Sequence, residues 1–182
     1  MKKLDEHALA VTAFWRKAGP DAWFTKDEAF DTDFRNRFLD LHYAAARREL
    51  DDWIDQTESA LALMILLDQF PRNCFRGTGH MYATDALARH FASRAIAVGH
   101  DLTVDNDLRV FFYLPFEHSE DLADQHRSVE LTQANAEEYI KYAVEHRDIV
   151  ERFGRFPHRN PMLGRETTPQ EKAYLEDGGF SG

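Results

Sequence analysis

Apolar residues recur along this chain at the three- and four-residue spacing that is typical of amphipathic helices. The first apolar stripe comprises Leu4, Ala8, Val11 and Trp15. It predicts a helix that ends at Gly19-Pro20, because this dipeptide favours a helix stop. The second stripe comprises Phe30, Phe34, Phe38 and Leu41. It predicts a second helix, with Asp27 or Asp31 as its N-cap.

The run from Leu61 to Leu67 is apolar at every position. A helix that is apolar all round belongs in the middle of a fold, so a central helix is predicted over 58–69. A buried strand is the alternative, but the Ala, Leu and Met content and the length of the run favour a helix. The next stripe predicts a helix over 80–98 that stops at Gly99. Its inward residues are expected to be Leu87, Phe91, Ala95 and Val98.

Shorter helices are predicted in the second half of the chain. The apolar residues Leu108, Phe111 and Phe112 indicate a short helix over 105–113, which then meets Pro115. Ser119 is the expected N-cap of the following helix. Glu120 and Asp121 would lie in its first turn, where the helix dipole favours negative charge.

Capping signals also mark the last two helices. Asn135 with Glu138 suits the start of a helix that ends at Gly154. The sequence Thr168-Pro169-Gln170-Glu171 is a capping box with proline at the first helical position. The chain therefore reads as about eight helices without a sheet, stacked as antiparallel pairs in a bundle or a short helical solenoid. The fold class predicted is all-α.

The composition of the chain fits one globular domain over residues 1–182, with 43% hydrophobic and 13% aromatic residues. A net charge of −10 argues against nucleic acid and anionic membranes as partners. Cys74 is the only cysteine, which favours a reducing compartment. The N-terminal segment 1–6 turns acidic where a secretory signal needs an apolar core. A cytoplasmic protein, whose oligomeric state the sequence leaves open, is expected.

Two segments of the chain nearly repeat each other. One contains Phe70-Pro71-Arg72-Asn73 and continues to Arg76, and the other contains Phe156-Pro157-His158-Arg159-Asn160 and continues to Arg165. Both are expected to be rigid loops that follow a helix. Arginine offers a planar fork of donors, so such loops suit the binding of an anion. They equally suit hydrogen bonding that holds helix ends together, because the last carbonyls of a helix need donors.

The segment 114–121 concentrates titratable groups at a predicted helix start. His118 beside Glu117 and Ser119 could act as a general acid or base. The alternative is structural: Ser119 caps the helix, the acidic residues complement its dipole and His118 bonds a nearby carbonyl. Taken alone, the segment favours the structural interpretation.

Other chemistries receive less support from the sequence. The histidines 118, 126, 146 and 158 do not form a recognisable metal motif, so no metal is expected. Cys74 could be a nucleophile beside Arg72 and Arg76, but a cysteine is more often a small buried apolar residue. Phosphate-binding and dinucleotide motifs are not found, and no cofactor is expected.

Several motifs together resemble the bacterial family catalogued as domain of unknown function 924. These motifs are Phe14-Trp15, Trp23-Phe24, 67–73, Arg76-Gly77-Thr78, 114–120, His146-Arg147-Asp148, 153–160 and Leu163-Gly164-Arg165. The resemblance extends over essentially the whole chain, up to Gly178-Gly179-Phe180. It implies an all-α, tetratricopeptide-like fold in a cytoplasmic protein, and no established reaction. One departure is Glu166-Thr167-Thr168, where the family pattern often has Glu-Ser-Thr; the hydroxyl groups are kept.

The leading hypothesis is a site for a small anionic ligand, phosphorylated or carboxylated. The expected site residues are Arg72, Asn73, Arg76, Arg159, Asn160 and Arg165 as ligand contacts, His118 and Glu117 as acid/base groups, and Asp68, Ser119, Glu120 and His158 in support. If the protein is an enzyme, a hydrolase or transferase fits these groups. The alternatives are a tetratricopeptide-like scaffold for a protein or peptide partner, and arginines that only lock helix ends to Asp68, Glu117 or Glu120.

Overall fold

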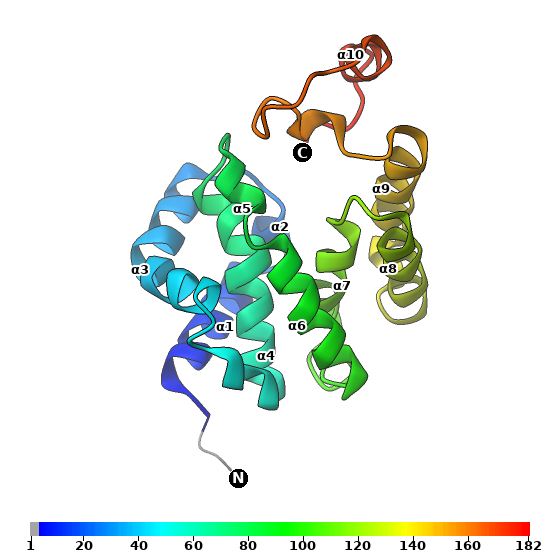
Figure 1. The fold of residues 1–182 in the computed structure, drawn as a ribbon. Coiled ribbons are helices and arrows are strands. Elements are labelled where there is room, and N and C mark those ends of the chain that lie inside the picture. Colours follow the sequence, from blue (N-terminus) through cyan, green and yellow to red (C-terminus); the bar gives the residue numbers. More distant parts are fainter. Residues whose placement is uncertain (1–3) are drawn as a thin grey trace.

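This computed structural model describes residues 4–182, and all of their regular secondary structure is helical (Figure 1). Its α-helices are α1 (Glu6–Ala18), α2 (Pro20–Trp23), α3 (Glu28–Ala46), α4 (Thr57–Met64), α5 (Phe70–Cys74), α6 (Asp85–Ala97), α7 (Val110–Glu117), α8 (Leu122–Asn135), α9 (Ile140–Phe153) and α10 (Pro169–Glu176). A π-helical turn covers Ile65–Gln69, and 3-10 turns cover Asp51–Asp55, Gly79–Tyr82, Asn106–Leu108, Glu137–Tyr139 and Pro157–Arg159. The prediction of an all-α fold is confirmed; the tetratricopeptide-like stacking stays a prediction.

The central helix is α4, as its apolar sequence predicts. It packs against α1 and α6, and every residue from Ala60 to Leu67 is fully buried. Burial of one such leucine stabilises the fold by about 1.5–3 kcal/mol, which explains why an all-round apolar helix is kept at the centre. Figure 1 shows α1 and α3 on one side of α4 and α6 on the other.

Helix α7 joins this central part to the hairpin of α8 and α9. It packs against α6 and α8, and α8 packs against α9. All residues of α7 are buried, from Val110 to Glu117. A smaller apolar cluster joins Ile149 and Val150 near the end of α9 to Phe156, and Phe180 near the C-terminus packs against it. The C-terminal segment therefore closes onto the α9 end of the molecule.

Three capping predictions are confirmed. The Asp27 side chain accepts hydrogen bonds from the first turn of α3. Gly154 ends α9 with a left-handed φ of 69°, which glycine adopts without steric cost. Thr168 and Glu171 form the capping box of α10. Local sequence signals thus set these helix ends.

The predictions around Pro115 and Ser119 were wrong. Pro115 lies inside α7, because the burial of the surrounding apolar residues outweighs the backbone hydrogen bond that proline cannot donate. His118 is the C-cap of α7, so it follows a helix end and does not open a helix. Asp121, not Ser119, caps α8, and its carboxylate accepts from Ala123 and Asp124.

Further corrections concern Val98, Asn135 and the first Pro-Arg segment. Val98, the residue directly after α6, was expected to face inward but is 68% exposed to solvent. Asn135 is the last residue of α8 and donates to the Leu131 carbonyl, so it caps no following helix. The segment 70–74 is the helix α5, which continues directly from the π turn. Only the second Pro-Arg segment is a loop, with a 3-10 turn at its start.

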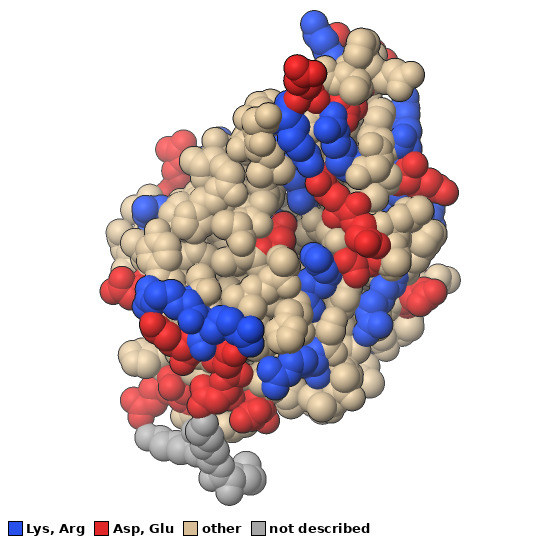
Figure 2. Space-filling model, viewed as in Figure 1, with Lys and Arg blue, Asp and Glu red and all other residues tan. Residues whose placement is uncertain are grey.

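The surface carries mixed charge. Figure 2 shows Lys and Arg side chains standing beside Asp and Glu on the face it presents. Among residues 4–182, no helix has both the length and the apolar character that a membrane span requires. Residues 1–3, which belong to the segment considered for a secretory signal, lie outside the described residues.

Candidate anion-binding cavity

A cavity of about 510 Å³ lies between the central part of the molecule and its C-terminal part. Its charged and polar lining residues are Gln69, Arg72, Asn73, Arg76, Tyr82, Glu117, His118, His146, His158 and Arg159. Its apolar and aromatic lining includes Trp23, Phe24, Met81, Val110, Leu114, Tyr139, Tyr142 and Phe180. This volume lies within the range of about 300–1,000 Å³ that is common for small-molecule sites. The cavity combines a charged wall with an aromatic one.

The π turn after α4 positions the first acidic group of the charged wall. Such turns expose carbonyls that a regular helix would use, and they occur often at functional sites. Here the Leu66 carbonyl lies 2.8 Å from Nδ1 of His42, and the Leu67 carbonyl accepts a hydrogen bond from Thr84 Oγ1 at 2.5 Å. The turn therefore has partners for its carbonyls, and it places Asp68 in contact with Arg72 and His118, which line the cavity.

Asp68 and His118 form a buried hydrogen-bonded pair. Oδ1 of Asp68 lies 2.8 Å from Nδ1 of His118, and Oδ2 accepts from Gln69 Nε2 at 2.7 Å. Burial opposes ionisation of Asp68, but Arg72 and His118 outweigh it and lower the pKa of this carboxyl to about 2. The carboxylate thus accepts the Nδ1 proton, and Nε2 of a neutral His118 keeps its lone pair. Burial and the Arg72 cation lower the pKa of His118.

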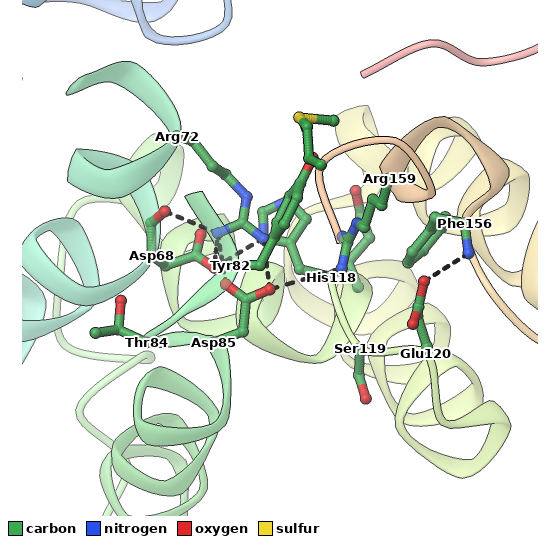
Figure 3. Close-up of polar contacts among 12 residues, drawn as sticks. Asp68, Arg72, Tyr82, Thr84, Asp85, His118, Ser119, Glu120, Phe156 and Arg159 are labelled. Carbon is green, nitrogen blue, oxygen red and sulfur yellow. Dashed lines mark hydrogen bonds and ion pairs between the residues drawn. The ribbon is translucent and has the colours of Figure 1, made fainter. Parts of the chain in front are cut away.

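Arg72 connects Asp68 to the start of α6. Its guanidinium donates to both oxygens of Asp85, at 2.8 and 3.0 Å, and lies 3.1 Å from Oδ1 of Asp68 (Figure 3). It also donates to the Asp68 carbonyl at 2.9 Å. Burial opposes the charge on Arg72, but the two carboxylates outweigh it and raise the pKa of the guanidinium. The fork of Arg72 is therefore already occupied by protein acceptors.

Arg159 is the least satisfied cation of the site. The residue is only 6% exposed, and its buried Nε has no hydrogen-bond partner among residues 4–182. The nearest carboxylate oxygen among the described residues is Oδ2 of Asp85, 3.6 Å from Nη1. The guanidinium carbon lies 4.5 Å from the ring centre of Tyr82 and 4.4 Å from that of Phe156. Burial and the Arg72 cation lower the pKa of Arg159 to about 10.

Figure 3 shows how the two arginines are arranged. Arg72 and Arg159 approach Asp85 from two sides, with the ring of Tyr82 between them. The guanidinium of Arg72 also lies over this ring, 5.9 Å from its centre. Two cations that line the cavity thus contact one carboxylate behind them, and Arg159 is the more distant of the two.

Glu117 is a buried carboxyl group beside the same cavity. It is 3% exposed, and burial together with the Asp68 charge raises its pKa to about 8. Its Oε1 lies 3.4 Å from Nδ1 of His146, which is 2.9 Å from the Tyr142 carbonyl. Burial and His118 lower the pKa of His146 to about 3. At neutral pH the site therefore holds a protonated Glu117 and a neutral His146.

His158 is also held neutral by its surroundings. Burial and the Arg159 cation lower its pKa to about 4, and its buried Nδ1 has no hydrogen-bond partner among the described residues. Its ring lies against Phe156 and Phe180, with centroid separations of 5.8 and 5.1 Å. His158 thus adds a neutral polar group to the wall beside Arg159.

The other residues expected at the site are more closely tied to the protein. Asn73 donates to Asp31 at 2.7 Å, and Arg76 donates to the same carboxylate at 2.8 Å, although both also line the cavity. Ser119 donates to Asp124 at 2.7 Å, next to the N-terminus of α8.

Asn160, Arg165 and Glu120 form a separate network in the C-terminal segment. Arg165 donates to both oxygens of Glu120, at 2.7 and 3.0 Å, and to Asn160 Oδ1 at 2.9 Å. Glu120 also accepts from the Phe156 backbone amide at 2.8 Å. These bonds fix the loop that presents Arg159 to the cavity.

Sequence reasoning missed several residues of this site. Asp85 and Tyr82 lie in no motif, and Gln69 lies in the 67–73 motif but was not expected at the site. They come from the start of α6, the 3-10 turn before it and the π turn. The aromatic wall was also missed, because Trp23 and Tyr139 are far apart in the chain. The near-repeat of the two Pro-Arg segments was the useful signal: both Arg72 and Arg159 line the cavity.

The sequence profile of a family described as bacterial protein of unknown function (DUF924) matches residues 11–179. The chain belongs to this family. A solved structure of a protein of unknown function from Agrobacterium tumefaciens is 65% identical in sequence, with a TM-score of 0.92. The match covers 94% of this chain and 97% of the other. A comparison with curated proteins found no matching sequence.

Proposed function

We propose that the protein binds a small anionic ligand in this cavity, with Arg159 as its main cationic contact. The observation that carries this proposal is the buried Arg159 guanidinium, which is not hydrogen-bonded to any carboxylate of the described chain. A buried donor without an acceptor costs about 1–3 kcal/mol, and more when it is charged. An anion in the cavity would supply acceptors to the terminal nitrogens of this guanidinium and offset part of the cost of burying its charge.

Arg72 has a different role in the proposal. Its two terminal nitrogens already contact Asp68 and Asp85. Arg72 therefore stabilises the wall and adds positive potential, but it does not offer these donors to the ligand. Asn73 and Arg76 remain candidate contacts at the cavity edge. We assign Asn160, Arg165, Glu120 and Ser119 to supporting the surrounding loop and helix start.

The same cavity offers acid/base groups to a bound ligand. Asp68 orients His118 through Nδ1, so Nε2 is available as a general base, in the manner of a carboxylate–histidine pair in hydrolases. Glu117, protonated at neutral pH, is the candidate general acid. If the protein is an enzyme, this pair fits a hydrolase or transferase that acts on an anionic metabolite, with Arg159 stabilising developing negative charge.

A protein- or peptide-binding scaffold is the second candidate. The observation that favours it is the exposure of aromatic residues at the cavity edge, where Phe24 is 55% and Tyr142 is 47% exposed. Exposed aromatic groups often mark contact surfaces for macromolecules. A scaffold would bind through these rings and would not depend on Arg159, which separates it from the ligand proposal.

A thermal-shift screen against carboxylated and phosphorylated small compounds tests the proposal. A ligand at about 100 times its dissociation constant adds about 2.7 kcal/mol to the free energy of unfolding, which gives a readable rise in Tm. The matched variants are Arg159→Gln and Arg37→Gln; Arg37 is an exposed arginine of α3, paired with Asp33. We expect the shift in the wild type and in Arg37→Gln, but not in Arg159→Gln. An equal shift in Arg159→Gln would overturn the proposed site.

A further inference from the structure

We propose that the ligand is a monocarboxylate carried on an aromatic or other apolar body. This inference rests on the proposed function and narrows it from small anions in general to one chemical class. It predicts that the carboxylate meets Arg159 and that the apolar body lies along the aromatic wall of the cavity. Both ends of such a ligand have a matching surface among the described residues.

The charge balance of the wall argues for a single negative charge on the ligand. Arg72 and Arg159 carry two positive charges, and Asp68 and Asp85 carry two negative charges within the same contact network. A phosphate monoester carries about 1.5–2 negative charges at neutral pH, so it would leave the buried site strongly negative. A carboxylate adds one charge only. The wall, in which Arg159 has only a 3.6 Å ion pair with Asp85, accommodates that smaller charge at lower cost.

The geometry of Arg159 also suits a planar acceptor. Its guanidinium is held between the rings of Tyr82 and Phe156, at 4.5 and 4.4 Å. Rings on two sides leave the edge of the fork as the direction from which an acceptor can approach. A carboxylate matches this edge with two parallel hydrogen bonds in one plane.

The aromatic wall is already ordered by contacts within the protein. Trp23 is 3% exposed, and its indole N–H is used by the Trp15 carbonyl at 2.7 Å, so it offers the cavity an apolar ring. Phe24 at the cavity edge stacks on Phe111 with centroids 6.0 Å apart, and its edge meets Tyr139 at 5.9 Å. These contacts fix Phe24 although more than half of it is exposed. A preformed aromatic edge favours a ligand with an apolar body, because its side chains lose little conformational freedom on binding.

Calorimetric titration with four matched probes tests this inference. The probes are phenylacetate, phenyl phosphate, 2-phenylethanol and acetate. We expect phenylacetate to bind at least about tenfold more tightly than each of the others, since only it has both the single charge and the ring. Tighter binding of phenyl phosphate, abolished by Arg159→Gln, would overturn the carboxylate class while keeping the anion site. Equal binding of acetate and phenylacetate would overturn the apolar body. No binding of any probe would overturn the aromatic monocarboxylate class, whereas the anion site itself is decided by the thermal-shift screen with Arg159→Gln.

A pair of surface variants tests the aromatic wall independently. Phe24→Ala removes an exposed ring at the cavity edge, and Leu102→Ala removes a 53% exposed side chain that does not line the cavity. We expect Phe24→Ala to weaken phenylacetate binding by roughly fivefold to tenfold and Leu102→Ala by less than about twofold. Acetate affinity should be the same in both variants. Unchanged phenylacetate affinity in a folded Phe24→Ala protein would overturn the assignment of this wall.

Discussion

Arg72 and Arg159 share Asp85, but only Arg72 is hydrogen-bonded to it. Both oxygens of Asp85 accept from Arg72 at 2.8 and 3.0 Å, whereas Nη1 of Arg159 stands 3.6 Å away. The two arginines come from the two similar Pro-Arg segments of the chain. Their environments differ: Arg72 donates to both oxygens of Asp85, whereas Arg159 has only a longer ion pair with the same carboxylate.

Arg72→Met should therefore destabilise the protein far more than Arg159→Met. Loss of Arg72 leaves Asp68 and Asp85 buried without their main cation, which costs about 3–5 kcal/mol of the free energy of unfolding. Loss of Arg159 removes contacts to two rings and costs no more than about 1–2 kcal/mol. Urea unfolding of both variants checks this order. A larger loss in Arg159→Met would show that Arg159, not Arg72, holds the buried network.

Glu117→Gln should change how stability depends on pH. The pKa of Glu117 is raised from about 4.5 to about 8, so the folded state binds a proton that the unfolded state releases. This contribution to stability is fully present below pH 4.5 and is lost as pH rises towards 8. The free energy of unfolding of the wild type relative to Glu117→Gln should fall by up to about 1.4 kcal/mol per pH unit across that window.

The difference in the free energy of unfolding between the wild type and Glu117→Gln separates the effect of Glu117 from that of the histidines. His146 and His158 have lowered pKa values, near 3 and 4, so they act in the opposite direction: their contribution is lost as pH falls below about 6.5. Both histidines are present in the wild type and in Glu117→Gln, and their effects cancel in the difference. A difference that stays constant from pH 5 to 8 would contradict a protonated Glu117.

Asp68→Asn should lower the pKa of His118 further. Asp68 is the nearest negative charge to His118 and favours its charged form, in opposition to burial and Arg72. The wild-type imidazole should carry its proton on Nδ1 and leave Nε2 free. Nitrogen-detected NMR of the histidine rings over a pH series reads both the pKa and the tautomer. Observation of the Nε2–H tautomer in the wild type would count against His118 as a base directed at the cavity.

Cys74 should react slowly with thiol reagents in the folded protein. Burial and the neighbouring Asp31 raise the pKa of its thiol to about 12, so almost no thiolate is present at neutral pH. The alternative of a nucleophilic Cys74 activated by Arg72 and Arg76 predicts the reverse. Labelling with iodoacetamide at pH 7.5, in native buffer and in urea, distinguishes them. Native labelling as fast as labelling in urea would contradict the raised pKa.

The helices could be predicted from the sequence because their signals are local. The stripe around Phe34, the all-apolar α4 and the cap at Asp27 each depend on residues within one or two turns. The prediction at Pro115 was wrong for the same reason, because proline is a strong local signal for a helix break. The burial of the whole of α7 explains why the helix continues through it. Tertiary packing outweighs local propensity there.

The candidate site could be predicted only in part. Repetition of the Pro-Arg pattern indicated Arg72 and Arg159, and proximity in sequence indicated Glu117 and His118. Nothing in the pattern distinguished Arg165, which is hydrogen-bonded to Glu120, from Arg159, which has only a 3.6 Å ion pair with Asp85. That difference depends on which carboxylates the fold brings within reach. The wall from Trp23 to Tyr139 joins helices that are distant in the chain, so sequence spacing carried no sign of it.

A crystal structure of the protein soaked with 4-bromophenylacetate would locate both ends of the ligand, because the bromine marks the ring by its anomalous signal. We expect carboxylate oxygens about 2.7–2.9 Å from the guanidinium nitrogens of Arg159 and bromine density along the wall of Trp23 and Phe24. Density elsewhere on the surface, with Arg159 facing only Asp85, would contradict this expectation.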